Sequence, residues 1–201
     1  MRQPERMPCP VGMSTSLRVA RAVSILGHPM LVMPLAAWLA IRASDAALRT
    51  SVELVGGILL LGACVLAFSA AQVRRGRWMH VDASGEDERR SLNVFLLLLF
   101  AAGAIIAWLN QGVSPLCMAL ALAAAIILVA LLISPICKLS LHVAFIAFAA
   151  FVPGTLAAGI GIGALGAGVA WSRLRLGRHV PVDLLAGLLA GTAAGIVFLA
   201  S

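Results

Sequence analysis

The sequence predicts an all-α protein, a polytopic transmembrane helical bundle of six or seven crossings. Sixty-two per cent of its 201 residues are hydrophobic, 11 per cent are charged and the mean hydropathy is +1.04, far from the balance of a soluble globular domain. The apolar runs are long and show no period-two alternation, and a membrane span must satisfy its own backbone hydrogen bonds. These two facts favour helices over a barrel.

The first 22 residues are the most polar part of the N-terminal region. They carry four arginines and no apolar core of their own, so we expect a basic cytoplasmic tail ahead of a retained first span rather than a cleaved signal. Residues 23–201 leave no room for a sizeable soluble domain once the apolar runs are set aside. We therefore expect them to form a single transmembrane domain.

Seven apolar stretches follow one another along this domain, at about 23–41, 52–73, 92–109, 116–133, 139–152, 155–171 and 182–200. A membrane span needs roughly 20 residues, and five of the seven are comfortably long enough. The region 139–171 is either one long crossing or two short ones that turn at Pro153 and Gly154. We favour two short, tilted crossings because of the charge distribution that this choice produces.

With two crossings there, the tail and the loops at 74–91, 134–139 and 172–181 share one face of the bundle. That face then holds every lysine and arginine except Arg42 and Arg49, which is 13 of 15. Such asymmetry is typical of a cytoplasmic face. We therefore predict an integral membrane protein, in a bacterial inner membrane, with its N-terminus and its polar face in the cytoplasm.

The net charge of +7 raises the question of which anionic partner the chain meets. The basic residues lie in loops between apolar runs and are not interleaved with aromatic residues, which argues against nucleic acid. An anionic membrane surface and anionic lipid substrates fit better. The four cysteines have no metal-ligand spacing, so we expect small apolar residues rather than a metal site or a disulfide framework.

Three polar segments punctuate the shared face, at 80–93, 137–142 and 172–183. Each precedes an apolar span, and a helix N-terminus offers unpaired amides and the positive end of the helix dipole. Three such segments at one rim predict an anion-binding pocket. His28 and His80 lie near the same face, and we expect them to be packing or rim residues.

The third segment contains a pair of residues suited to catalysis. Pro181 is favourable in the first turn of a helix, which puts His179 at the helix start and Asp183 one turn further on, where their side chains can meet. A carboxylate that is hydrogen-bonded to an imidazole fixes its tautomer. The pair is then either a nucleophile with its orienting group or a pair of solvated capping residues.

This segment resembles the third signature of the type 2 phosphatidic acid phosphatase (PAP2) superfamily, which shares its site with the vanadium haloperoxidases. The match is Ser172-Arg173, five residues, His179, three residues and Asp183. Where the family's second signature reads Pro-Ser-Gly-His, this chain has Leu-Ser-Leu-His at 139–142. Where its first reads Lys, six residues and Arg-Pro, this chain has Asp, six residues and Arg-Arg at 82–90.

The resemblance implies a role for each matching residue. His179 would attack phosphorus and form a phosphohistidine, Asp183 would orient it, and His142 would protonate the leaving alkoxide. Four further residues would hold the phosphate: Arg89, Arg173, Ser140 and Ser172. Because the family's lysine is missing, three more residues are candidates for supporting roles: Lys138, Arg90 and Asp82. No metal ion and no cofactor is implied.

The function expected from this resemblance is hydrolysis of a lipid phosphate monoester or a prenyl diphosphate. One alternative is a phospholipid-binding or lipid-translocating protein that keeps the pocket but not the turnover. Another is a prenyl transferase in which Asp82, Glu86 and Asp87 hold magnesium on a diphosphate.

Overall fold

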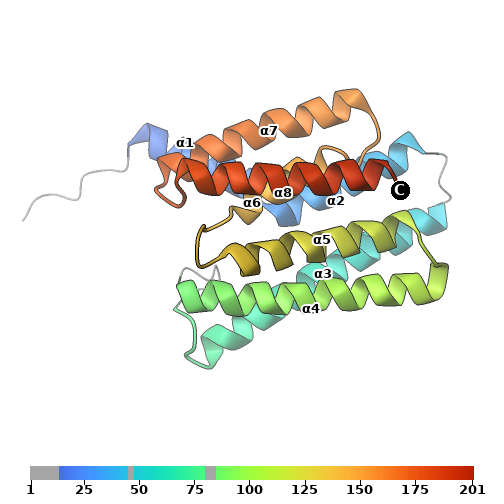
Figure 1. The fold of residues 1–201 in the computed structure, drawn as a ribbon, viewed down its shortest axis with the longest axis horizontal. Helices are drawn as coiled ribbons and strands as arrows, with labels where there is room; N and C mark the ends of the chain where they lie inside the picture. Colours follow the sequence, from blue (N-terminus) through green and yellow to red (C-terminus); the bar gives the residue numbers. More distant parts are fainter. Residues whose placement is uncertain (1–13, 45–47, 80–84) are drawn as a thin grey trace, which may run out of the picture.

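The computed structural model of the protein describes residues 14–44, 48–79 and 85–201, and within these ranges all regular secondary structure is helical. The eight helices lie mostly side by side along the long axis of the molecule (Figure 1). Their bounds are α1 (Thr15–Leu26), α2 (Pro29–Ala43), α3 (Leu48–Arg74), α4 (Glu86–Gln111), α5 (Pro115–Ile133), α6 (Leu141–Ala149), α7 (Leu156–Arg175) and α8 (Pro181–Leu199).

Five of these helices, α3, α4, α5, α7 and α8, are long and apolar enough to cross a membrane. Helices α1 and α2 pass the same test together as one span bent by 49°. The predicted all-α polytopic bundle is therefore confirmed, with five candidate spans, or six if the bent pair is one. The first helix starts at Thr15, inside the region predicted to be a tail.

The predicted crossing at 139–152 differs most from expectation. It forms only the nine-residue helix α6, which at 1.5 Å per residue is about 14 Å long, roughly half the hydrocarbon thickness of a bilayer. The chain then continues without a long helix to the far end of the bundle, where α7 begins (Figure 1). The segment thus still connects the two ends, but α6 alone is not a candidate span.

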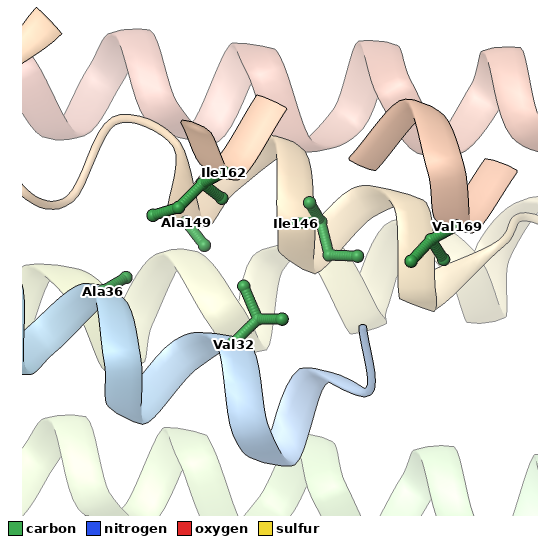
Figure 2. Close-up of a cluster of buried hydrophobic side chains, with 6 residues drawn as sticks. All are labelled: Val32, Ala36, Ile146, Ala149, Ile162 and Val169. Carbon is green, nitrogen blue, oxygen red and sulfur yellow. The ribbon is translucent and has the colours of Figure 1, made fainter. Parts of the chain in front are cut away.

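Helix α6 lies in the centre of the bundle and carries much of its core. Ile146 and Ala149 of α6 pack between α2 and α7, where Val32 and Val169 complete one buried cluster (Figure 2). On another side α6 packs against the face of α8 that carries Gly187 and Gly191, which we call the glycine face. A Cβ at Gly187 would lie 2.6 Å from the Ser140 carbonyl oxygen, so the two backbones approach more closely than any larger residue would allow.

Substituting Gly191 tests this backbone contact between α8 and α6. A Cβ at Gly191 would overlap the carbonyl oxygen of Ala144, and forcing atoms into a packed core costs about 1–3 kcal/mol. We expect Gly191→Ala to lower stability by that amount in thermal unfolding in detergent. Gly161→Ala is the control, because Gly161 of α7 has open space around it and should gain slightly from the better helix former. Equal stability of the two variants would contradict the close packing.

The described parts of the three polar segments lie at one end of the bundle, as predicted. The starts of α4, α6 and α8 and the ends of α5 and α7 all lie there (Figure 1). The Ser140 amide donates to the Asp183 carbonyl oxygen at 3.0 Å, and Lys138 Nζ donates to the Arg178 carbonyl oxygen at 3.2 Å. Two of the three segments are therefore joined directly by hydrogen bonds.

Candidate active site

The start of α8 holds the central pair of the site. Pro181 occupies the first turn, as predicted, and Asp183 lies three residues after the N-cap residue Val180. The Asp183 Oδ2 atom lies 3.2 Å from His179 Nδ1 and accepts from the Val180 amide at 3.2 Å. The predicted contact between His179 and Asp183 is therefore present, with both side chains less than a tenth exposed.

The second Asp183 oxygen binds the loop that precedes α6. Its Oδ1 accepts from the Lys138 amide at 3.1 Å and from Cys137 Sγ at 3.4 Å. An ionised carboxylate only accepts hydrogen bonds, so His179 Nδ1 must carry a proton in this geometry. The Nε2 lone pair of a neutral His179 is then available for attack.

Burial and charge set the protonation of the groups around this pair. Burial is the largest influence on the pKa of His179 and lowers it. The hydrogen bond to Asp183 raises this pKa, whereas the positive charges of Arg173 and Lys138 lower it further. Burial and the hydrogen bond to Asp183 raise the pKa of Cys137, so its thiol stays protonated as a donor. At neutral pH His179 is therefore mainly the uncharged imidazole that a nucleophile requires.

A cavity of about 2320 Å³ opens beside this pair. Among its lining residues are six that the sequence predicted for the phosphatase site. They come from α4, from the loop before α6, from α6, from the end of α7 and from the loop before α8. They are Arg89, Arg90, Lys138, His142, Arg173 and His179. Lys138 lies within electrostatic reach of Arg89, Arg173 and Asp183, so the single lysine of the chain is close to the predicted phosphate-binding arginines.

Three other predicted residues do not line this cavity. Asp183 contacts His179, which does line the cavity. Ser140 and Ser172 are fully buried, and Ser172 Oγ donates to the Val169 carbonyl oxygen at 2.7 Å within α7. Their predicted contact with phosphate finds no support in this arrangement. Asp82 lies outside the described residues.

Four residues that the sequence did not assign to the site also line the cavity: Arg21, Ser24, His28 and Arg178. The first three come from α1 and the α1–α2 junction. Their spacing of three and then four residues is that of one helical face, and this spacing was the available signal. His28 was predicted to be a packing or rim residue, yet its ring meets that of His142 with the centroids 4.9 Å apart.

The cavity is charged at one end and apolar along most of its length. Six cationic side chains line it, and we call this group the basic mouth: Arg21, Arg89, Arg90, Lys138, Arg173 and Arg178. Two carboxylates, Glu86 and Asp87, also line the cavity, whose apolar part runs between α2, α3, α4 and α5. Such a space suits a molecule with an anionic head and a long apolar tail.

Within the described ranges, no three His, Cys, Asp or Glu residues are grouped so that they could hold a metal ion. Comparisons of the chain with protein-family models, curated proteins and solved structures gave no significant match. The chemistry of this cavity is therefore inferred from the side chains that line it.

Proposed function

We propose that the protein is a lipid phosphatase of the PAP2 type, which hydrolyses a lipid phosphate monoester or prenyl diphosphate. One observation supports this above all others. Arg89, His142, Arg173 and His179 line a single cavity, although they come from four separate parts of the chain, and Asp183 fixes the tautomer of His179. A nucleophile, an acid and anion-binding arginines at one cavity are the parts that phosphoryl transfer needs.

The proposed reaction has two steps. Burial and the positive charge of Arg173 lower the pKa of His142, so His142 takes up its proton when the anionic phosphate binds beside it. His179 Nε2 then attacks phosphorus, the bond from phosphorus to the lipid oxygen breaks, and His142 gives this proton to that oxygen. Water then attacks the phosphohistidine, His142 takes the proton of the water, and the phosphorus–nitrogen bond breaks to release inorganic phosphate and restore His179. Asp183 stabilises the positive charge that the His179 ring gains in the first step.

The basic mouth supports the binding of the phosphate oxygens. Arg89 and Arg173 offer forked donors that match phosphate oxygens bidentately, and Lys138 adds a point charge beside them. The lipid tail would lie in the apolar part of the cavity. We also propose that the basic mouth faces the cytoplasm. In the predicted topology, 13 of the 15 lysines and arginines lie on the same face of the bundle as the basic mouth, which is typical of a cytoplasmic face.

Purified protein in detergent is the direct test. We expect phosphate release from phosphatidic acid or a prenyl diphosphate, persisting in EDTA, and far less from glycerol 3-phosphate, which lacks the tail. Lipid binding without any phosphate release would contradict the proposal and favour a lipid-binding or lipid-translocating protein.

Replacing His142 with Ala should show its role through the leaving group. General acid catalysis contributes about 10²–10⁴-fold, so we expect turnover of a lipid phosphate to fall about 10³-fold. A p-nitrophenyl phosphate carrying the same tail needs no proton on its leaving oxygen, so its first step, measured as the burst of p-nitrophenol before water attacks the phosphohistidine, should slow far less. An equal loss on both substrates would exclude His142 as the acid.

The pH dependence should report the pKa of His179. Only the neutral ring can attack, so activity is lost as the pH falls through this pKa, which lies below its ordinary value of 6.5. Lys138 lowers it through its positive charge, so Lys138→Met should raise the pKa and move the acid limb of kcat/KM to higher pH. Arg175→Met is the control, because Arg175 does not line the cavity. A limb that stays in place would contradict the assignment.

One observation favours a second candidate function, magnesium-dependent prenyl transfer. Glu86 and Asp87 line the same cavity, and carboxylates are the usual protein ligands of magnesium on a diphosphate. This function predicts that EDTA abolishes activity and that added Mg²⁺ restores it. Activity that is unchanged in EDTA would exclude the magnesium-dependent transferase and support the phosphatase.

A further inference from the structure

Helix α1 packs closely against α7, the helix that carries Arg173. A Cβ added at Gly27 would overlap the side chain of Val169 in α7, and Ala20 and Val169 are both fully buried. Val169 also belongs to the cluster that joins α7 to α2 and α6 (Figure 2). The position of α1 relative to α7 is therefore fixed by packing rather than by surface contacts alone.

The face of α1 next to the cavity provides one hydrogen bond to the site. Arg173 Nη1 donates to Ser24 Oγ at 3.1 Å, and both groups are partly buried. An arginine side chain has several rotatable bonds, so a bound nitrogen restricts where its remaining donors can point. Ser24 thus limits the orientation of a guanidinium that lines the cavity.

The junction of α1 and α2 provides a second contact. His28 is the N-cap of α2, and its Nδ1 accepts from the Met30 amide at 3.2 Å. The cap holds the imidazole in one orientation, and in that orientation it meets the His142 ring almost at right angles, with an interplanar angle of 88°. His28 thus packs against the predicted acid and limits its rotation.

We propose that α1 and its junction with α2 form a fourth wall of the active site beside the three polar segments, and that Ser24 positions Arg173 while His28 positions His142. Neither residue belongs to the three polar segments that carry the chemistry. The proposal rests on the phosphatase function proposed above for the roles of Arg173 and His142.

The Ser24 contact has a matched control in the same pair of helices. Ser16 Oγ accepts from Arg175 Nη2 at 3.1 Å, also between α1 and α7, but this pair is exposed and does not line the cavity. We expect Ser24→Ala to lower kcat/KM for the lipid phosphate about tenfold, as expected for a lost hydrogen bond to a charged group. Ser16→Ala should remain within about twofold of wild type, and Ser24→Thr, which keeps the hydroxyl, should recover most of the loss. Equal effects of Ser24→Ala and Ser16→Ala would overturn the role of Ser24.

Two substitutions of His28 separate its cap from its ring. Asparagine caps a helix well but lacks the ring, so His28→Asn should lower kcat about 10- to 100-fold with little change in unfolding temperature. Phenylalanine keeps a ring but cannot accept from Met30, so His28→Phe should lower the unfolding temperature and keep kcat within about threefold. The opposite pattern, an active His28→Asn and an inactive His28→Phe, would show that His28 is only a cap.

Binding of inorganic phosphate to the wild type and to Ser24→Ala distinguishes the failure of this proposal from the failure of the function. If the wild type hydrolyses no lipid phosphate but binds phosphate about tenfold more tightly than Ser24→Ala, the function fails and the positioning of Arg173 stands. If the wild type hydrolyses lipid phosphates and neither Ser24→Ala nor His28→Asn differs from it, the fourth wall is overturned and the function stands. Absence of both hydrolysis and binding overturns both.

Discussion

Replacing His179 with Ala is expected to abolish phosphate release, with turnover falling about 10⁶-fold, the size of loss seen when a hydrolase loses its nucleophile. The variant lacks the nitrogen that would form the proposed covalent intermediate, and no other histidine in the described part of the chain is hydrogen-bonded to a carboxylate. Phosphate release from the lipid substrate and labelling of the protein by a ³²P-lipid under alkaline quenching measure the two consequences. The wild type should be labelled and the variant should not.

The His179→Ala variant should also fold, which makes its inactivity interpretable. Asp183 keeps three donors when the imidazole is gone, because Val180 N, Lys138 N and Cys137 Sγ still bind its oxygens. No uncompensated buried carboxylate is created, so the unfolding temperature should change little. Persistent phosphohistidine in the variant would identify another nucleophile and contradict the assignment.

Asp183→Asn is the second substitution with a large expected effect. Both carboxylate oxygens are acceptors, and an asparagine replaces one of them with an NH₂ donor. That NH₂ group would face two donors, either Val180 N and His179 Nδ1 or Lys138 N and Cys137 Sγ. The tautomer of His179 is no longer fixed, and the comparable change in a serine protease triad costs about 10⁴-fold in turnover. We expect a loss of this order in steady-state kinetics.

Asp87→Asn provides the matched control for charge. It removes one carboxylate from the lining of the same cavity, but Asp87 is exposed and near the start of α4. The phosphatase mechanism predicts a change within about threefold, the size expected of an exposed charge. If Asp87→Asn were inactive and Asp183→Asn active, the magnesium-dependent transferase would be favoured over the phosphatase.

The long helices could be predicted from the sequence because hydropathy alone specifies them. The sequence predicts spans at residues 116–133 and 182–200. Helices α5 and α8 differ from these bounds by no more than about one residue at each end. Helix α6 could not be distinguished from a span, since a buried helix surrounded by protein is as apolar as one surrounded by lipid. Its length depends on the turn at residues 150–155 and on the glycine face of α8, which are tertiary contacts.

The candidate site divides in the same way. The contact of His179 with Asp183 is local, four residues apart after a proline, and helix geometry predicts it. The burial of Ser140 and Ser172 depends on which face of each helix meets its neighbours, and a small hydroxyl residue is tolerated on either side. Ser24 was missed because its partner is 149 residues away and because it lies inside the apolar stretch 23–41, which predicts a span and not a site.

The shortness of α6 has a consequence for the biogenesis of the protein. A helix of half the span length exposes backbone amides and carbonyls at both ends, and such unsatisfied groups are costly in lipid. The helices α7 and α8, which pack around α6, become available only after they have left the ribosome. The loop before α6 can bind Asp183 only after α8 inserts, because the Ser140 amide donates to the Asp183 carbonyl oxygen and the Lys138 amide donates to Asp183 Oδ1. A nascent chain that lacks α8 therefore has no assembled candidate site, and we expect the proposed activity only after α8 has inserted.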